Sequence, residues 1–345
     1  MDNRWVLSPL VFFLFLAIDF FCHPSALQAA PPAPRVVITY GALAEREAPL
    51  HVATDQGFFR KYGLDVQVVH TRGAPTGISA MASGDCQFWY GTASAVTFGA
   101  IVGGLDGVFV AGLINKLTGT FVVAPGIKSP SDLKGRTVGV TGMGGGIWMY
   151  AMLALDHWGL DPKRDKINLR VIGDQPVIAQ AIATGIVDGG YLSYTFASAL
   201  ERQGFRILAD LAKLNIPILS VGMYGRRSFV NQSPDAVEKV LRALVDAIVF
   251  IQEPANKSAV VRSLVKGLHL PRVEEAQEGY ERLKNIFAMP IYPSVDGIRN
   301  VIRLLGMTNE KIGRLKPEDV VDNRIVKKLE QEGLFQRLDH SAEGK

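Results

Sequence analysis

The sequence predicts an α/β protein of two similar lobes, because one pattern of strand, helix and turn is present twice in it. The first copy begins at Arg35–Gly41, and the second begins at Arg136–Gly142, about a hundred residues later. Each copy continues through a Gly-Leu-Asp turn, a β-branched segment and an alanine-rich helix that is followed by glycine. Two equivalent α/β halves predict two lobes with a ligand cleft between them. Chance similarity between two ordinary βαβ units is the alternative.

Length and composition agree with this organisation. The chain has 345 residues, of which 48% are hydrophobic and 20% are charged. This composition is typical of globular proteins, and the length allows about two domains. The formal net charge is +4, and the lysines and arginines are scattered along the chain. Without a basic helix face interleaved with aromatic residues, a nucleic-acid partner is not expected.

The first thirty residues have the layout of a secretory signal peptide. Arg4 provides a positive start, Leu10–Ile18 is an apolar run, and Ala26–Ala30 is a small-residue end. The apolar run is shorter than a membrane span, and a retained anchor is the alternative. We therefore expect export to a periplasm. Cleavage would remove Cys22 and leave Cys86 as the last cysteine, so no internal disulfide is expected.

Strands and helices alternate through the first copy. Val36–Thr39 predicts a short buried strand, and Pro49 suits the first turn of a helix that runs to Gly63. The other elements expected in this half are strands at Val66–Val69, Cys86–Tyr90 and Val108–Leu113, and helices at Ile78–Ser83 and after Gly91–Ser94. This alternation predicts a mostly parallel sheet with helices on both faces. In such sheets ligands bind at the carboxyl ends of the strands.

The chain is expected to cross between the lobes twice, which would form a two-stranded hinge. Thr120–Ala124 is the strand expected to leave the first lobe, and Ile216–Tyr224 is the strand expected to return. Helices beginning at Ser233-Pro234-Asp235 are then expected to pack on the first lobe. The predicted parts are a signal peptide (1–30), the first part of lobe 1 (31–122), lobe 2 (123–217), the completion of lobe 1 with C-terminal helices (218–340), and a disordered tail (341–345).

Loops at the ends of the strands supply the candidate binding residues. Gly73–Thr76, Gly91–Ser94 and Gly144–Ile147 each precede a helix, and helix starts present free N–H groups and the positive end of a dipole. Convergent helix starts predict a receptor for a carboxylate, a sulfonate or a similar anion. The alternative is that these residues only shape turns. The candidate ligand-binding residues are Tyr40, Gly41, Arg72, Gly73, Thr76, Gly91, Thr92, Ser94, Asn115, Thr141, Gly144, Gly145, Gly146, Gly190 and Tyr191.

Charged and aromatic side chains extend this list. Arg46, Arg72 and Lys116 lie on or beside the loops and could supply positive charge. The candidate aromatic walls are Trp89, Tyr90, Trp148 and Tyr191, of which Tyr191 is favoured. Alternation along a strand sends Trp89 and Tyr90 to opposite faces, so at least one of them is expected in the core.

Catalytic and cofactor motifs are not expected. The six histidines are dispersed without metal-ligand spacing. The loop Gly142–Ile147 is superficially similar to a dinucleotide loop, but Ile147 occupies the position of the third glycine. A carboxylate such as that of Asp188 more often caps a turn than acts in catalysis. We therefore interpret the chain as a binding protein without catalytic residues, a metal or a cofactor.

Three segments in this order resemble the nitrate/sulfonate/taurine-type solute-binding proteins of ABC transporters, the SsuA/THI5-like or NMT1 family. They are Ala53–Val66, Ser129–Val140 and Ala183–Gly189, and Asp322-Asn323 also fits the family's tail. The resemblance covers roughly residues 35–338 and implies a type II periplasmic-binding-protein fold. The loop Thr141–Gly146 has glycines where many members have serine or threonine. The family's sulfonate or nitrate preference is therefore not carried over to this chain.

The expected function is that of an extracytoplasmic, monomeric solute-binding protein. It would capture a small, anionic solute between the lobes and deliver it to an ABC permease driven by a separate ATPase. An enzyme on the same fold is one alternative, either similar to thiamine-pyrimidine synthase or a lyase. The thiamine enzyme's cysteine-rich motif is missing here. A receptor of a tripartite ion-driven transporter, or a sensor input, is the other alternative.

Overall fold

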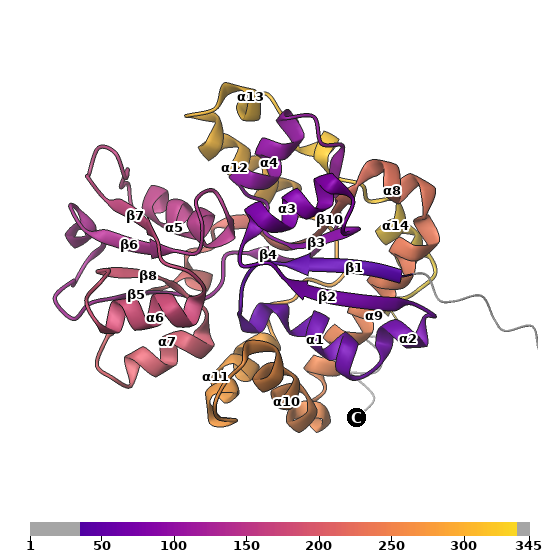
Figure 1. Ribbon diagram of the computed structural model, residues 1–345, viewed down its shortest axis with the longest axis horizontal. Helices are drawn as coiled ribbons and strands as arrows, with labels where there is room; N and C mark the ends of the chain where they lie inside the picture. Colours follow the sequence, from indigo (N-terminus) through magenta and orange to yellow (C-terminus); the bar gives the residue numbers. More distant parts are fainter. Residues whose placement is uncertain (1–34, 337–345) are drawn as a thin grey trace, which may run out of the picture. The chain divides into compact units, whose positions relative to one another are not determined.

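The computed structural model describes residues 35–336, which form two five-stranded sheets (Figure 1). The first sheet has the order β2 (Asp65–His70), β1 (Arg35–Tyr40), β3 (Phe88–Gly91), β10 (Pro217–Arg226) and β4 (Gly107–Lys116). The second has the order β7 (Asn168–Val171), β6 (Thr137–Val140), β8 (Gly189–Leu192), β5 (Thr120–Val123) and β9 (Arg206–Asp210). The predicted signal peptide, Cys22 and the predicted tail lie outside the described residues.

The two sheets have the same topology, which confirms two α/β lobes. β1 pairs in parallel with β2 and β3, and β6 pairs in parallel with β7 and β8. The fourth strand of each sheet comes from outside the repeat and is antiparallel to its neighbours: β10 lies between β3 and β4, and β5 lies between β8 and β9. Each sheet is therefore mixed rather than mostly parallel, because each lobe takes its fourth strand from the segment that connects it to the other.

Helices follow the strands in both lobes. The first lobe has α1 (Ala48–Asp55), α2 (Phe58–Lys61), α3 (Ala74–Ser83) and α4 (Ala95–Val102), and the second has α5 (Gly146–His157), α6 (Gln175–Ala183) and α7 (Tyr194–Glu201). The predicted helix from Pro49 to Gly63 is in fact two helices. It breaks at Gly57, whose φ of 74° lies in the left-handed region and cannot continue an α-helix.

The C-terminal part is helical. It comprises α8 (Arg227–Gln232), α9 (Pro234–Gln252), α10 (Lys257–Leu268), α11 (Glu274–Leu283), α12 (Val295–Gly306), α13 (Glu310–Gly313) and α14 (Arg324–Gln331). Short 3-10 turns lie at Glu45–Glu47 (η1), Pro130–Leu133 (η2), Leu211–Leu214 (η3), Pro254–Asn256 (η4) and Pro317–Val320 (η5). Within residues 35–336, no helix combines the length and the apolar character that spanning a bilayer requires.

The C-terminal helices contact both lobes, whereas the sequence predicts that they pack on the first lobe. α9 packs against α1 and α2, whereas α11 packs against α7 of the second lobe. This contact is close: a Cβ atom at Gly279 of α11 would lie 2.2 Å from Oγ1 of Thr195 on α7. The C-terminal segment therefore also connects the lobes.

The chain crosses between the lobes at two adjacent segments. The first crossing is Leu117–Gly119, because β5 pairs entirely within the second sheet. The predicted boundary after residue 122 is therefore late and falls inside β5. The backbone N–H of Leu117 donates to the carbonyl of Ile216, which holds the two crossings side by side. The second crossing ends where β10 begins, at Pro217, as the sequence predicts to within a residue.

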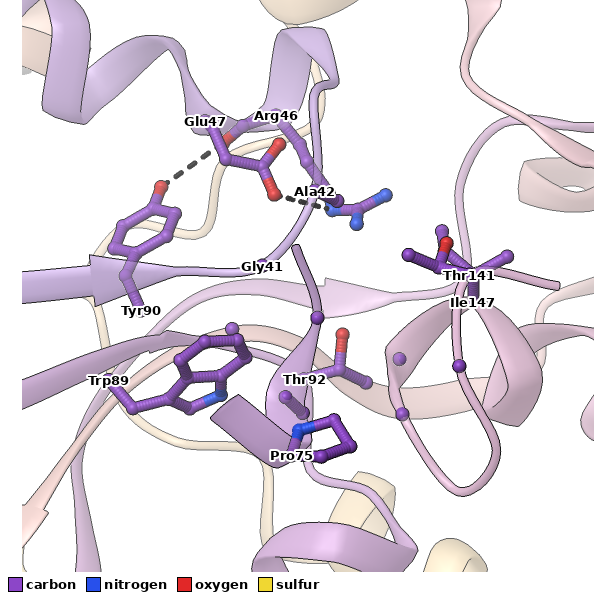
Figure 2. Close-up of a pocket in the computed structure, with 16 residues that line it drawn as sticks. Gly41, Ala42, Arg46, Glu47, Pro75, Trp89, Tyr90, Thr92, Thr141 and Ile147 are labelled. Atoms are coloured by element: carbon purple, nitrogen blue, oxygen red, sulfur yellow. Dashed lines mark hydrogen bonds and ion pairs between the residues drawn. The ribbon is translucent and has the colours of Figure 1, made fainter. Parts of the chain in front are cut away.

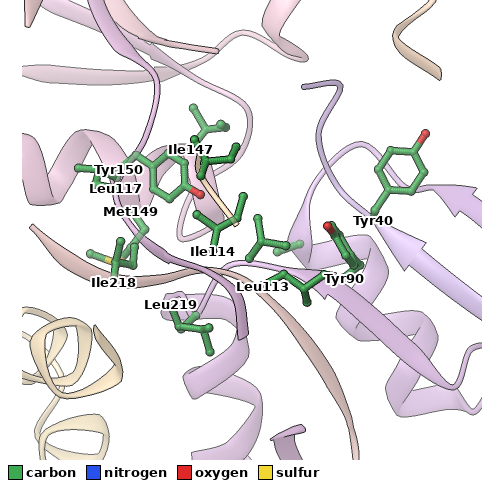
Figure 3. Close-up of a cluster of buried hydrophobic side chains, with 14 of the residues drawn as sticks. Tyr40, Tyr90, Leu113, Ile114, Leu117, Ile147, Met149, Tyr150, Ile218 and Leu219 are labelled. Atoms are coloured by element: carbon green, nitrogen blue, oxygen red, sulfur yellow. The ribbon is translucent and has the colours of Figure 1, made fainter. Parts of the chain in front are cut away.

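An apolar cluster surrounds these crossings (Figure 3). It includes Leu113 and Ile114 of β4, Met149 and Tyr150 of α5, and Leu219 of β10, all of them fully buried. The core of the first lobe therefore continues past the crossings to the first helix of the second lobe.

Trp89 of β3 accounts for several of the small residues around it. Its side chain is only 3% exposed. A Cβ atom would lie 2.4 Å from the indole at Gly41, 2.3 Å at Gly77 and 2.6 Å at Gly91. Real Cβ atoms do not approach ring atoms this closely, so these glycines provide the space that the indole occupies.

We expect Gly77→Ala to destabilise the protein, although alanine normally favours a helix. The added methyl group would meet the Trp89 ring, and overpacking of a core costs about 1–3 kcal/mol. The matched control is Gly99→Ala in α4, where a Cβ atom has no neighbour within 4 Å. That variant should be neutral or gain up to about 1 kcal/mol. Urea denaturation measures both; equal effects would contradict the proposed role of Gly77.

Candidate functional site

A small pocket lies where the loops after β1, β2, β3 and β6 meet (Figure 2). Its volume is about 30 Å³, which is room for one or two water molecules. It is lined by Gly41, Ala42, Arg46, Glu47, Gly73, Ala74, Pro75, Trp89, Tyr90, Gly91, Thr92, Thr141, Gly142, Gly145, Gly146 and Ile147. Residues 141–147 belong to the second lobe and the others to the first, so the pocket lies between the lobes.

The structure brings seven of the predicted binding residues together at this pocket. They are Gly41, Gly73, Gly91, Thr92, Thr141, Gly145 and Gly146. The rule that ligand loops follow parallel strands therefore predicts the location, and ligand binding there stays a proposal.

Two helices direct their first turns at the pocket. α3 begins after Gly73 and α5 begins after Gly145, and neither N-cap residue makes a side-chain capping bond. The first backbone N–H groups of a helix have no partner within it and lie at the positive end of its dipole. The start of α4 is different, because Ser94 is fully buried and its N–H donates to Oγ1 of Thr97. Two of the three predicted helix starts therefore contribute to the pocket.

The glycines of the loop 142–146 allow the two lobes to touch. The N–H of Val96 in α4 donates to the carbonyl of Gly144 across the pocket edge, at 3.1 Å. A Cβ atom at Gly146 would lie 2.7 Å from Oγ1 of Thr92. Thr92 Oγ1 in turn donates to the carbonyl of Ser220 in β10. Small residues at these positions therefore permit a close approach between the start of α5 and the first lobe.

A buried run of three charged residues lies beside the pocket, and two of them, Arg46 and Glu47, line it. Glu45, Arg46 and Glu47 make up the turn η1, and each is at most 5% exposed. Arg46 Nε lies 3.2 Å from Glu47 Oε1, and Arg46 Nη1 donates to the Tyr191 hydroxyl at 3.0 Å. Glu45 Oε1 accepts from the N–H of Tyr194 at 2.8 Å. The turn therefore connects the first lobe to β8 and α7 of the second.

Aromatic rings enclose the Arg46 guanidinium. Its central carbon lies 5.2 Å from the centre of the Tyr150 ring and 5.9 Å from that of Tyr191. Burial acts to lower the pKa of Arg46, but the neighbouring Glu47 and tyrosines outweigh it and raise the pKa, so Arg46 stays charged. Burial also raises the pKa of Glu47 to about 8, against the opposing effect of Arg46.

Three polar atoms of the pocket lining are buried and have no hydrogen-bond partner within residues 35–336. They are Glu47 Oε2, Trp89 Nε1 and Thr141 Oγ1. The first accepts hydrogen bonds when the carboxyl is ionised, the second only donates, and the third does both. In Figure 2 Arg46 and Glu47 lie on one side, Trp89 and Pro75 lie on another, and Thr141 and Ile147 come from the second lobe.

Several predicted residues lie away from the pocket. The Tyr40 ring packs against His51 and His70. Gly190 is buried inside the second sheet, where a Cβ atom would lie 3.0 Å from the carbonyl of Gly139. Asn115 donates to the carbonyl of Tyr292 and accepts from the N–H of Ser294, so it fixes a loop of the C-terminal part.

Other predicted residues support the site from behind or lie beside it. Tyr191 is 1% exposed and accepts from Arg46, so it orients that residue and does not itself line the pocket. Ser94 caps the start of α4 within the first lobe, and Gly144 accepts from Val96 in the contact between the lobes. Thr76 is exposed in the first turn of α3, and Arg72 precedes that helix in a left-handed conformation with φ of 53°.

Sequence reasoning missed the acidic part of the site. It named Arg46 as a source of charge but did not name Glu45 or Glu47. It treated Trp89 as one of several aromatic candidates, and Trp89 does line the pocket. An available signal was the Glu-Arg-Glu run between the first strand and the Pro49 helix start, next to the glycine loop.

We expect Glu47 to make stability fall as pH rises. Its folded pKa of about 8 lies above the ordinary value of 4.5, so its contribution is fully present below pH 4.5 and is lost as pH rises through about 8. Each pKa unit corresponds to about 1.4 kcal/mol. His51 opposes this slope in mildly acidic solution, because burial lowers its pKa to about 4. Glu47→Gln should therefore remove the Glu47 part of the slope alone.

Denaturation in urea at a series of pH values, on the wild type and Glu47→Gln, measures this difference. If the two proteins show the same pH dependence, Glu47 is not the group responsible.

Comparison with known proteins agrees with the two-lobe organisation. A family model described as NMT1/THI5 like matches residues 45–257, more than half of the chain. The chain is 27% identical over 214 residues to the binding protein YtlA of Bacillus subtilis, which covers 61% of this chain and 64% of YtlA. It is 24% identical over 285 residues to the nitrate/nitrite binding protein NrtA of Nostoc, which covers 69% of this chain and 60% of NrtA. The chain thus spans less than two thirds of the length of these relatives.

A solved structure has the same fold. The alkanesulfonate-binding protein SsuA from Xanthomonas axonopodis, bound to MOPS, matches with a TM-score of 0.68 at 19% identity, covering 86% of this chain and 100% of SsuA. At this identity the likeness concerns the fold alone. The family match includes the turn η1, both crossings and the whole second lobe. Because it covers more than half of the chain, it shows that the chain belongs to the NMT1/THI5-like family.

Proposed function

We propose that this protein is an extracytoplasmic solute-binding protein that captures a small solute between its lobes. The observation that carries this proposal is the inter-lobe pocket, whose lining includes buried polar atoms of both lobes that have no hydrogen-bond partner among the described residues. A polar atom that is buried without a partner costs about 1–3 kcal/mol. A solute that pairs with these atoms removes that cost only when the lobes are together. It therefore favours the closed arrangement over the open one.

The size of the pocket fits a closed arrangement. A volume of about 30 Å³ is too small for an organic solute, and binding pockets for such solutes measure about 300–1,000 Å³. The solute would enter while the lobes are apart, and the lobes would then close as far as its bulk allows. The two adjacent crossings at Leu117 and Ile216 are the natural hinge for this motion.

An anionic group on the solute is supported by the helix starts. The first turns of α3 and α5 lie at the pocket from opposite lobes, and helix starts favour negative charge. The relatives NrtA and SsuA are named for nitrate or nitrite and for alkanesulfonates, which are small anions. We infer that this chain also binds a solute with a carboxylate, sulfonate or similar group.

Delivery to an ABC permease is the proposed next step. The signal-peptide pattern supports export to the periplasm, and the absence of a nucleotide motif from the sequence supports a separate ATPase. The closed protein would dock on the permease as a monomer and release the solute there.

A panel of small inorganic and organic anions tests the proposal directly. We expect at least one compound to bind reversibly, to raise the melting temperature, and to come off unchanged. A solute at one hundred times its Kd should stabilise the protein by about 2.7 kcal/mol. Differential scanning fluorimetry followed by calorimetry measures this. Chemical turnover of the bound compound would instead indicate an enzyme, and no binding across the panel would contradict the proposal.

We expect Gly146→Ala to weaken solute binding without unfolding the protein. The added methyl group would meet Thr92 Oγ1 and hold the start of α5 away from the first lobe. A cost of about 1–3 kcal/mol in the closed arrangement corresponds to a loss of affinity of about five- to 150-fold. Gly126→Ala is the control, because its Cβ atom has no neighbour within 4 Å and it lies away from the site.

Calorimetry with the solute found in the panel compares these variants with the wild type. Wild-type affinity of Gly146→Ala would mean that binding does not require the lobes to approach at this point.

A further inference from the structure

A histidine and an aspartate face each other across the lobe interface, and neither residue lines the pocket. His70 is the last residue of β2 in the first lobe, and Asp174 directly precedes α6 in the second. His70 Nε2 lies 3.7 Å from Asp174 Oδ1, and the two side chains are 20% and 12% exposed. Both atoms are buried and have no hydrogen-bond partner within residues 35–336. Because 3.7 Å is too long for a hydrogen bond, the closed arrangement buries this pair without satisfying it.

The carboxylate of Asp174 does not serve its own helix. Asp174 is the N-cap residue of α6, a position at which aspartate ordinarily accepts from the first backbone N–H groups, yet its side chain makes no capping bond. Its backbone carbonyl accepts from the N–H groups of Val177 and Ile178, so the first turn forms without the carboxylate. The side chain is therefore held toward His70 of the first lobe.

Strand order places this pair far from the crossings. β2 and β7 are the outer strands at one end of the two sheets, whereas β4, β10, β5 and β9 lie at the other end, next to the crossings. His70 ends β2, and Asp174 follows β7 after a short loop. A rotation about the crossings moves the outer strands more than the strands beside the hinge. Opening therefore separates His70 from Asp174 and returns both side chains to water.

Closure changes how readily His70 takes up a proton. Burial lowers the pKa of His70 against the opposing effect of Asp174. Arg72 and His269 act in the same direction as burial. Burial also raises the pKa of Asp174, so each group of the pair is more stable uncharged when the lobes are together. The charged and titratable groups that act on His70 are Tyr40, His51, Arg72, Asp174 and His269.

Two of these neighbours keep one charge state in neutral and mildly acidic solution. Burial raises the pKa of Tyr40 to about 12, and burial lowers the pKa of His51 to about 4. His51 is also packed against α10, where a Cβ atom at Gly267 would collide with its ring. His269 follows α10 and is exposed, so closure does not bury it. His70 is therefore the histidine of this cluster that lobe closure removes from water.

We propose that the contact between His70 and Asp174 is a pH-sensitive switch of lobe closure, in which protonation of the His70 imidazole favours the open arrangement. This inference rests on the lobe motion of the proposed function and adds a control over that motion. The control acts at the outer edge of the interface and does not depend on which solute the pocket takes. Neutral solution favours the closed arrangement, and mildly acidic solution favours release.

The direction of the effect follows from proton linkage. In the open arrangement His70 is hydrated and has its ordinary pKa of 6.5. Because closure lowers this pKa, the contribution of His70 to closure is present above pH 6.5 and is lost as pH falls. If the closed arrangement binds no proton at His70, the ratio of closed to open protein falls about tenfold between pH 7.5 and pH 5.5. Asp174 has the opposite sign, and its contribution is fully present only below its ordinary pKa of 3.8.

Small-angle X-ray scattering without added solute tests the inference, because the radius of gyration reports the separation of the lobes. We expect the radius of the wild type to be larger at pH 5.5 than at pH 7.5, and to return to its first value when the pH is restored. Circular dichroism at both pH values checks that the protein stays folded.

Three variants identify the group responsible. His70→Gln keeps a polar side chain that does not take up a proton, so its radius should be the same at both pH values. Asp174→Asn should keep or increase the response, because it removes both the attraction for a protonated imidazole and the opposing titration of the carboxylate. His269→Asn is the matched control: it removes a neighbouring, exposed histidine at a φ of 54°, which asparagine tolerates, and it should respond as the wild type does.

The contrary outcomes are distinct. A wild-type radius that is unchanged by pH overturns the inference. A radius that decreases in acid also overturns it, because the protonated imidazole would then attract Asp174 and close the lobes. A response that persists in His70→Gln assigns the effect to another group and overturns it as well. None of these results depends on a solute, so the anion panel decides the proposed function separately.

Discussion

Three consecutive charged side chains, buried where the lobes meet, constrain the rest of this molecule. Charges removed from water are costly unless each is paired. Glu45, Arg46 and Glu47 are paired, but two of their partners, Tyr194 and Tyr191, belong to the second lobe. If the lobes separate, water can replace those partners. In the proposed function, the free energy of closure depends on how well the polar atoms of this turn are hydrogen-bonded inside the protein, and a solute changes that balance.

The glycines around the pocket have two different physical roles. Gly41, Gly77 and Gly91 surround the Trp89 indole, so they set the position of a side chain that lines the pocket. Gly144 and Gly146 lie in the second lobe and let the start of α5 reach the first lobe. The first role is internal to one lobe and persists in any arrangement. The second role matters only when the lobes are together.

The duplicated topology could be predicted from the sequence because it depends on local properties. These are the periodicity of strands and helices, the glycines that end helices, and the spacing of these features along the chain. The fourth strand of each sheet could not be predicted in the same way. β5 and β10 pair antiparallel with strands that are distant in sequence, and nothing local to Thr120–Val123 indicates its partners. The contact between α11 and α7 was missed for the same reason, since an amphipathic helix does not specify which surface it covers.

The candidate site shows a similar division. The rule that parallel strands end at ligand loops located Gly73, Thr92 and Gly145, because it depends only on strand order. Side-chain direction was not accessible, so Tyr191 was expected in the pocket and instead supports Arg46 from behind. Glu47 was missed because an acidic residue in a loop is exposed in most proteins, and only the tertiary structure buries it.

These features together determine how selective closure can be. Contacts such as Val96 with Gly144 and Arg46 with Tyr191 join the two lobes and involve no solute, so they favour the closed arrangement without discriminating among solutes. The unpartnered atoms of Glu47, Trp89 and Thr141 oppose closure until a solute pairs with them. A solute that satisfies only part of this set leaves the remaining cost in place. If the protein closes on a solute as proposed, discrimination among solutes arises from the atoms that the closed protein leaves unsatisfied, rather than from the number of contacts that it already makes.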